Sequence, residues 1–204
     1  MRMTAEDTAF IAIDVQNDFC PGGALAVADG DSVVPVINDL MTAYPVKVLT
    51  QDWHPADHFS FAANTEGAAP FSLVEAPYGP QVLWPTHCVQ GSNGAAFHKD
   101  LDTDAADLIV RKGYRSAIDS YSAFFENDHV TPTGLEGYLR SRGVTKLVMA
   151  GLATDFCVRF SAVDAAKLGF EVTVIGAGCR AIDMDGSLAQ ARQDMLDHGV
   201  VIAD

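Results

Sequence analysis

Short runs of apolar residues recur along this chain and are separated by longer segments in which apolar residues follow a helical spacing. The runs are nearly continuous instead of alternating with polar residues, which is typical of parallel strands buried on both faces. Five runs and a short terminal sixth predict strands at Ala9–Asp14, Val46–Thr50, Leu108–Arg111, Lys146–Ala150, Glu171–Ile175 and Val200–Ile202.

Four helical segments lie between these strands, at Ser32–Tyr44, Thr133–Arg142, Asp155–Leu168 and Ser187–Leu196. Strands that alternate with helices predict an α/β fold of three layers, with a mostly parallel sheet and helices on both faces. We expect one domain over residues 1–204. The segment Trp53–Lys99 is long, irregular and rich in aromatic residues, Gly and Pro. Such a segment is usually functional or a linker.

Composition narrows the class of protein. Hydrophobic residues make up 49% of the chain and charged residues 20%, which indicates a globular protein. The formal net charge of −14 argues against a nucleic-acid partner, because phosphate backbones select basic proteins. We see no apolar signal core at the N-terminus and no run of membrane-spanning length, and the four cysteines lack paired spacing. We therefore expect a cytoplasmic protein with reduced thiols and no membrane partner.

Three chemically distinct side chains stand at the ends of predicted strands: Asp14, Lys112 and Cys157. Active sites of parallel α/β sheets lie beyond the carboxyl ends of the strands. Taken singly, these residues fit a capping Asp, a solvated Lys and a buried structural Cys. Together they indicate a catalytic triad in which the Asp accepts the thiol proton and the Lys holds the carboxylate. The Cys also opens a helix, where the positive helix end is expected to lower the pKa of its thiol.

A second group combines a carboxylate with imidazoles. Asp52 and His54 follow the second predicted strand, and His87 lies in Trp84-Pro85-Thr86-His87-Cys88. Such ligands suit zinc, manganese or iron. His58, Ser60 or water could complete the coordination shell. A single loop His is more often an ordinary polar residue, and that is how we interpret His98, His129 and His198.

Two large aromatic residues, Phe19 and Trp84, lie near these groups in the sequence pattern. They could hold a flat ring by stacking, although core packing is the commoner role of such residues.

These motifs together resemble one enzyme family, in which they occur in the same order over nearly the whole chain. The matching stretches are Asp14-Val15-Gln16-Asn17-Asp18-Phe19, Gln51-Asp52-Trp53-His54-Pro55, Trp84-Pro85-Thr86-His87-Cys88, Arg111-Lys112-Gly113 and Gly151-Leu152-Ala153-Thr154-Asp155-Phe156-Cys157-Val158. They resemble the bacterial nicotinamidases, also called pyrazinamidases, of the isochorismatase-like cysteine hydrolases. The Asp-x-His and Trp-Pro-x-His-Cys stretches are the more specific part, because several related amidases lack this metal site.

The resemblance implies a fold, a reaction and a set of residue roles. The fold is isochorismatase-like, and the reaction hydrolyses nicotinamide to nicotinic acid and ammonia through a Cys thioester, a step of NAD salvage and pyridine nucleotide biosynthesis. One divalent metal ion, zinc before manganese or iron, is implied. For the reaction, the implied roles are Cys157 as nucleophile, Asp14 as general acid/base and Lys112 as electrostatic partner, with the backbone N–H groups of Ala153 and Cys157 as oxyanion hole. The implied metal ligands are Asp52, His54 and His87. For the substrate ring, Phe19 and Trp84 are implied as a sandwich and Tyr121 as a pocket residue. A cis peptide before Ala153 is implied as well.

Other interpretations stay open at this point. The chain could be a related amidase that acts on another small amide, or a non-catalytic relative that binds a metal or ligand. A metal-bound water attacking the amide is an alternative chemistry, but it leaves Cys157 without a purpose. The sequence does not decide the metal, the activity on nicotinamide analogues, the place of Cys88, or whether the chain forms a homo-oligomer.

Overall fold

Six parallel strands form the central sheet, in the order β5-β2-β1-β6-β7-β8. The computed structural model describes residues 7–204. The strands are β1 (Thr8–Ile13), β2 (Val46–Asp52), β5 (Leu108–Lys112), β6 (Lys146–Leu152), β7 (Glu171–Arg180) and β8 (Val201–Ala203). Each corresponds to a predicted strand. The parallel sheet therefore confirms the predicted fold class.

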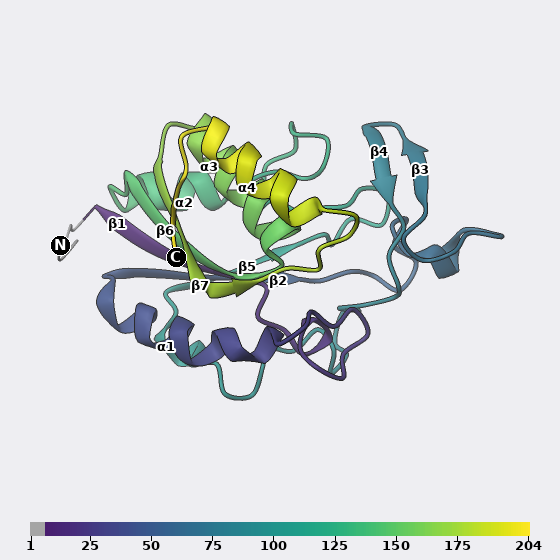
Figure 1. Cartoon of the computed structure of the whole chain (residues 1–204), viewed down its shortest axis with the longest axis horizontal. Helices are drawn as coiled ribbons and strands as arrows, with labels where there is room; N and C mark the ends of the chain where they lie inside the picture. The colour runs from purple at the N-terminus through teal and green to yellow at the C-terminus, as the bar shows by residue number, and fades with distance from the viewer. Residues whose placement is uncertain (1–6) are drawn as a thin grey trace.

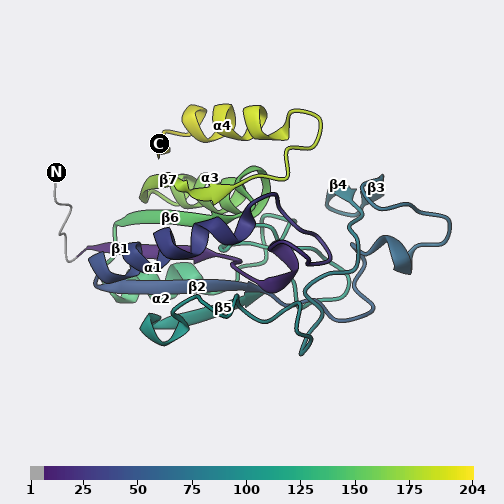
Figure 2. The ribbon, with the colours of Figure 1, turned by 60° about the horizontal axis from the view of Figure 1, so that its bottom comes forward.

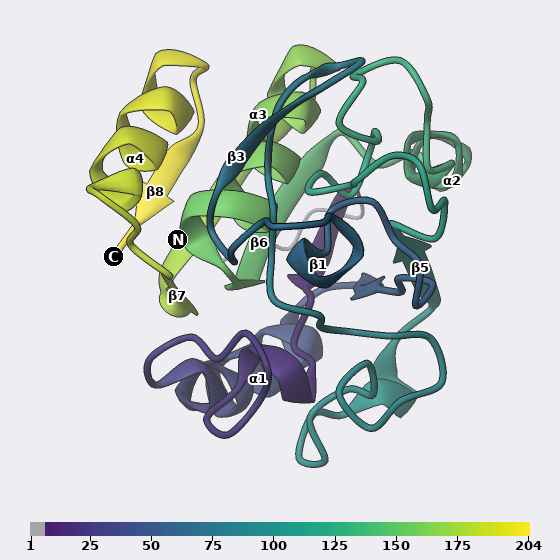
Figure 3. The same ribbon diagram turned by 90° about the vertical axis from the view of Figure 1, so that its right-hand side faces the viewer.

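Helices cover both faces of this sheet (Figure 1). They are α1 (Val33–Ala43), α2 (Leu135–Ser141), α3 (Arg159–Lys167) and α4 (Ser187–Asp197). Figure 3 shows α1 on one face and both α2 and α3 on the other, which gives the three predicted layers. The first helix illustrates why: Val33, Ile37 and Met41 recur at helical spacing and are buried on one side of it. None of the helices within residues 7–204 is long and apolar enough to cross a bilayer.

The ends of the elements differ from the prediction where the site begins. The first strand stops at Ile13, and Asp14 adopts a left-handed φ of 49°. The predicted helix Asp155–Leu168 is divided into a π-helical turn, Thr154–Val158, and α3. The Leu152–Ala153 peptide before that turn is cis, as the family resemblance implied. Four short 3-10 helices add to the connections, at Asn17–Phe19, Gly30–Ser32, Ala62–Asn64 and Thr103–Ala105.

The long segment Trp53–Lys99 contains an antiparallel hairpin that the pattern did not predict. Its strands are β3 (Leu73–Ala76) and β4 (Gly79–Val82). Each strand has only four residues, Leu73 is largely exposed and Pro80 interrupts the run, so no alternation of apolar and polar residues marks the hairpin. Figure 2 shows the hairpin beyond the end of the sheet toward which the strands run. It therefore lies on the side of the molecule where the strand-end residues gather.

One glycine sets how closely β6 approaches β1 beside the site. Gly151 has a φ of +138°, and a Cβ there would lie 2.1 Å from the carbonyl oxygen of Ile13 and 2.7 Å from its nitrogen. Both contacts are with backbone, which cannot move aside cheaply. Only glycine allows this approach.

We expect Gly151→Ala to lower the free energy of unfolding by roughly 2–5 kcal/mol, through backbone strain and overpacking. Chemical denaturation measures this free energy. The matched control is Gly137→Ala within α2, where a Cβ meets nothing within 4 Å. That change should instead stabilise the protein by roughly 0.5–1 kcal/mol. Equal midpoints for the two variants would contradict the close approach.

Candidate active site

A fully buried ammonium lies at the centre of the site. Lys112 ends β5, and its Nζ lies 2.8 Å from Asp14 Oδ2 and 2.5 Å from Asp52 Oδ1. It also donates to the carbonyl of Ser120 at 2.9 Å and lies 3.5 Å from Cys157 Sγ. The sheet order explains the grouping, since β5, β2, β1 and β6 are consecutive neighbours and end at one edge. The three residues of the predicted triad are thus brought together.

Asp14 is held by a residue that the sequence prediction did not include. Its backbone N–H donates to Thr50 Oγ1 at 3.1 Å, and that hydroxyl donates to Asp14 Oδ1 at 2.6 Å. The other oxygen, Oδ2, is ion-paired with Lys112 but accepts no hydrogen bond of good geometry from residues 7–204. This arrangement leaves Oδ2 as the oxygen that can accept a proton.

Electrostatics at the site differ from the expectation for Cys157. Burial raises the pKa of its thiol; Lys112 opposes that rise, but Asp14 and Asp52 add to it, and the pKa lies well above its ordinary value. We had expected the helix end to lower this pKa, so the net direction is the reverse. Burial also raises the pKa of Asp14, against the effect of Lys112. The cysteine is therefore a thiol at rest, beside a carboxylate that is more basic than usual.

Lys112 itself stays charged. Burial lowers the pKa of this ammonium, but Asp14 and Asp52 outweigh burial and hold the pKa well above its usual value.

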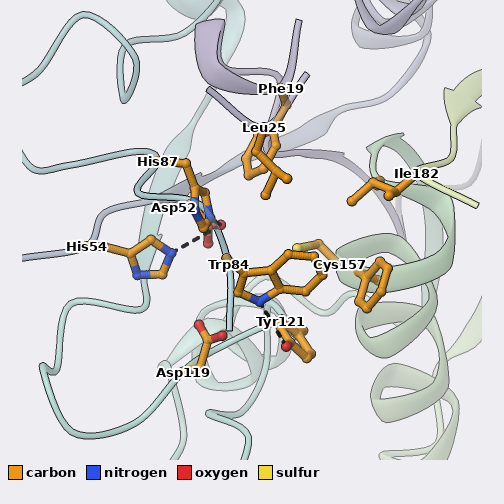
Figure 4. Close-up of a pocket in the computed structure, with 12 residues that line it drawn as sticks. Phe19, Leu25, Asp52, His54, Trp84, His87, Asp119, Tyr121, Cys157 and Ile182 are labelled. Carbon is orange, nitrogen blue, oxygen red and sulfur yellow. Dashed lines mark hydrogen bonds and ion pairs between the residues drawn. The ribbon is translucent and has the colours of Figure 1, made fainter. Parts of the chain in front are cut away.

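The predicted metal ligands also converge. One ligand atom each from Asp52, His54 and His87 lies within 4.8 Å of the others, and all three residues are buried. Nε2 of His54 is 3.5 Å from Asp52 Oδ2, and Nε2 of His87 is 3.8 Å from the same oxygen (Figure 4).

Hydrogen bonds orient both imidazoles of this group. Nδ1 of His54 lies 2.8 Å from the carbonyl of Gly113, and Nδ1 of His87 lies 2.8 Å from the carbonyl of Pro85. A carbonyl can only accept, so each Nδ1 carries a proton, and in the neutral ring Nε2, on the side of Asp52, has the lone pair that could bind a metal. Metal-binding histidines are commonly oriented in this way. The donor set and its outer hydrogen bonds therefore fit a divalent cation.

The candidates for a fourth protein ligand bond to each other. Nδ1 of His58 lies 2.8 Å from Ser60 Oγ, and Nε2 lies 3.1 Å from the carbonyl of Ile118. Burial lowers the pKa of His58 to about 4. Its ring packs beside His54, with ring centroids 4.3 Å apart, and a second close group of ligand atoms joins His54, His58 and Asp119. His58 does not belong to the close group of ligand atoms around Asp52.

A small cavity, partly open to solvent, joins the two groups. The predicted residues that line it are Phe19, Asp52, His54, Trp84, His87, Tyr121, Ala153 and Cys157. In Figure 4, Phe19 and Leu25 lie on one side of the cavity and Trp84 on the other. Aromatic walls, a thiol and a metal-ligand group therefore share one small space, which suits a flat ring that carries a reactive substituent.

The turn that carries Cys157 is fixed from both sides. The carbonyl of Ala153 accepts hydrogen bonds from the N–H groups of Phe156 and Val158, at 3.1 and 3.2 Å. Asp155 accepts from the N–H groups of Ile182 and Asp183, at 3.1 and 2.8 Å. It also accepts from Ser187 Oγ at 2.5 Å. These bonds hold the loop that brings Ile182 to the cavity.

Sequence reasoning missed several residues of the site. Leu25, Asp119, Phe156 and Ile182 line the cavity, and Thr50 orients Asp14. Two of them could have been found by their position in the sequence. Asp119 lies two residues before Tyr121, and Thr50 lies two residues before Asp52. A further signal was available for the contact of Asp52 with Lys112, because parallel pairing of β2 with β5 places these two residues opposite each other.

Comparison with known proteins identifies the family. The profile of the isochorismatase domain matches residues 8–204. The chain belongs to the isochorismatase family. A nicotinamidase of Acinetobacter baylyi is 54% identical to this chain, over 96% of this chain and 92% of the relative's length. A nicotinamidase of Escherichia coli is 44% identical to this chain, over 86% of this chain and 84% of the relative's length.

Solved structures of this family agree with the fold. The structure of a nicotinamidase and pyrazinamidase from Acinetobacter baumannii superposes with a TM-score of 0.97, at 53% identity over 98% of this chain and 97% of that one. A pyrazinamidase of Pyrococcus horikoshii was solved in complex with zinc and has a TM-score of 0.77 at 33% identity, over 97% of this chain and 99% of that one. The fold and the enzyme class of the chain, a hydrolase, follow from these relatives.

The contact of Lys112 with Cys157 predicts an effect on thiol reactivity. In Lys112→Ala the ammonium that opposes the rise in thiol pKa is lost, so alkylation of Cys157 at fixed pH should slow by about tenfold or more. Peptide mapping by mass spectrometry separates Cys157 from the other three buried cysteines. The control is Lys99→Ala, whose exposed ammonium pairs with its neighbour Asp100. An unchanged rate-against-pH curve in Lys112→Ala would show that Lys112 does not tune the thiol.

Proposed function

We propose that this protein is a nicotinamidase that hydrolyses nicotinamide to nicotinic acid and ammonia, as a cytoplasmic enzyme of NAD salvage. The observation that carries the proposal is one cavity lined by the Cys157 thiol, two aromatic walls and the Asp52–His54–His87 group. A pyridine carboxamide has the matching parts: an amide for the thiol, a flat ring for the walls and a ring nitrogen for a metal ion. The similar proteins of Acinetobacter and Escherichia coli carry the same name.

Acylation uses the three residues around Lys112. Asp14 Oδ2 takes the proton of the Cys157 thiol, and the sulfur attacks the carboxamide carbon. The raised pKa of Asp14 makes its carboxylate a stronger base for this transfer than an ordinary Asp. Lys112 neutralises the charge that moves between the carboxylate and the sulfur. Asp14 then returns the proton to the leaving ammonia, and a nicotinoyl thioester remains on Cys157.

Deacylation reverses the proton movement. Asp14 takes a proton from a water molecule, the hydroxide attacks the thioester carbon, and the thiol of Cys157 is released with that proton. We assign the developing oxyanion of both steps to the backbone N–H groups of Ala153, which precedes the π-helical turn, and of Cys157, which lies within it.

Ring binding uses the rest of the cavity. Phe19 and Trp84 stack on the faces of the pyridine, and Tyr121 completes the wall behind Trp84. Asp52, His54 and His87 would hold one divalent ion, with zinc first because a similar pyrazinamidase was solved with zinc. Bound there, the ion supplies a Lewis acid for the lone pair of the ring nitrogen. The metal identity and the ligand set are part of the proposal.

A related amidase acting on another small amide is the second candidate. The pairing of the thiol with a metal-ligand group in one cavity favours nicotinamide, since the lone pair of its ring nitrogen could bind a metal ion held there. A non-catalytic binding relative is disfavoured, because a binding protein has no need of a buried Asp14, Lys112 and Cys157 in contact.

Ammonia release from nicotinamide by the purified protein tests the activity, and Cys157→Ala tests the nucleophile. We expect Cys157→Ala to lose at least about 10³-fold in kcat while melting at the temperature of the wild type. Cys179→Ala is the matched control, since this cysteine is buried but does not line the cavity. Substantial turnover by Cys157→Ala would exclude the thioester.

Removal of the metal tests the role of the ring nitrogen. Chelation should lower kcat/KM for nicotinamide by about 10²-fold or more, because positioning of the ring is lost. Benzamide has the same carboxamide but no ring nitrogen, so any slow hydrolysis of benzamide should change little. Metal content is measured on the same samples. An equal proportional loss for both substrates would mean that the ion assists the hydrolysis itself and does not position the ring.

A further inference from the structure

A glutamine on the unpredicted hairpin reaches the wall of the cavity. Gln81 lies on β4 and its side chain is fully buried, although the hairpin extends away from the sheet (Figures 1 and 2). Its Nε2 lies 2.8 Å from Asp119 Oδ2 and 2.9 Å from the hydroxyl of Tyr121. Gln81 does not line the cavity itself. Its influence on a bound ring must therefore pass through a neighbour.

That neighbour is Tyr121. Its hydroxyl lies 2.9 Å from Gln81 Nε2 and also accepts a hydrogen bond from Trp84 Nε1 at 3.1 Å. Figure 4 shows this second bond, with the indole of Trp84 beside the cavity and Tyr121 behind it. The tyrosine ring packs edge-on against the indole, with centroids 6.1 Å apart. A continuous path of contacts thus runs from the hairpin to the aromatic wall.

The orientation of the Gln81 amide is fixed by its surroundings. The carbonyl of Val82, 2.8 Å from Nε2, and the carboxylate of Asp119 can only accept. On the other side, Oε1 accepts from the hydroxyl of Tyr78 and from Nδ2 of Asn127, both at 3.1 Å. If the amide were rotated by 180°, Oε1 would face the acceptors and Nε2 would face the donors. The hydrogen bonds at both ends would then be lost. Nε2 has two N–H groups and three acceptors within 2.9 Å, on Val82, Asp119 and Tyr121, so these acceptors share the two hydrogens. Such a buried polar network holds the amide in one arrangement.

We propose that Gln81 is a positioning residue that fixes the indole of Trp84, through Tyr121, in the plane that stacks on the substrate ring. The proposal rests on the proposed function for its substrate. The hairpin would then set the affinity for a planar aromatic amide, whereas the residues at the strand ends carry out the hydrolysis.

The kinetic signature follows from the role of a stacking wall. Stacking on the ring stabilises the bound substrate and the transition state about equally, so its loss raises KM and leaves kcat nearly unchanged. Gln81→Met keeps the length of the side chain but removes the amide. We expect KM for nicotinamide to rise by about tenfold, the effect of one or two lost buried hydrogen bonds, with kcat within about threefold of wild type. Gln90→Met is the matched control, because this glutamine is exposed and its side-chain amide donates to the backbone carbonyl of Trp53.

A double-mutant cycle tests the path through Tyr121. Tyr121→Phe removes the hydroxyl that joins Gln81 to Trp84, and should raise KM about as much as Gln81→Met. If Gln81 acts through that hydroxyl, the double variant should bind little worse than either single variant. Effects that multiply to about a hundredfold, or a loss confined to kcat, would overturn the proposal.

A spectroscopic measurement makes the test independent of turnover. The chain has two tryptophans, and Trp53 stacks under Arg111, so a Trp53→Phe background leaves Trp84 as the fluorophore. In that background Gln81→Met should lower the fluorescence anisotropy of Trp84 and weaken quenching by nicotinate, the proposed product.

Failure of wild type to release ammonia from nicotinamide would refute the proposed function, whereas an unchanged anisotropy and KM in folded Gln81→Met would refute this inference. If Gln81→Met does not fold, Tyr121→Phe gives the same readings, and an unchanged anisotropy and KM there would refute it.

Discussion

The burial of the Lys112 ammonium is the constraint on which the site depends. Its Nζ is fully enclosed and is balanced by Asp14 and Asp52, which come from the ends of two other strands. Removing one partner of such a buried pair typically costs roughly 3–5 kcal/mol, so the three strand ends must arrive together. Neighbouring parallel strands supply that register, since Asp52 pairs directly with Lys112 across β2 and β5. The strand order brings the two carboxylates to Lys112, and the buried charges in turn stabilise that strand order.

Asp52 belongs to two groups at once. Its Oδ1 contacts Lys112, whereas its Oδ2 faces the imidazoles of His54 and His87. The two carboxylates around Lys112 leave one negative charge beyond the ammonium, and a divalent cation beside Asp52 would offset it. The nucleophile and the ring-binding end of the cavity are thereby joined through one side chain. This explains why the two groups, far apart in the sequence, occur within one small cavity.

The strands and the residues at their ends could be predicted because both follow from local pattern and topology. Continuous apolar runs mark buried parallel strands, and the carboxyl ends of such strands gather at one edge. Lys112 was placed in this way from the predicted strand Leu108–Arg111 that precedes it. The direction of the thiol pKa could not be predicted, because the helix end was visible in the sequence whereas the burial of Cys157 beside two carboxylates was not. Whether the whole chain forms one domain, and which atoms hold a metal, stay predictions.

The resemblance implied Trp84 and Tyr121 as pocket residues, but their link to Gln81 escaped prediction for a different reason. Trp84, Tyr121 and Gln81 lie on loops and on a hairpin of four-residue strands, where no periodicity records which face is buried. Their relation is set by hydrogen bonds between segments about forty residues apart, and a single sequence does not show such pairs. A wall built from loops can change its contacts without disturbing the buried charges at the strand ends. Catalysis and ring recognition thus depend on different parts of the chain: the sheet fixes the acid, base and thiol, and the hairpin network fixes the surface against which the ring must lie.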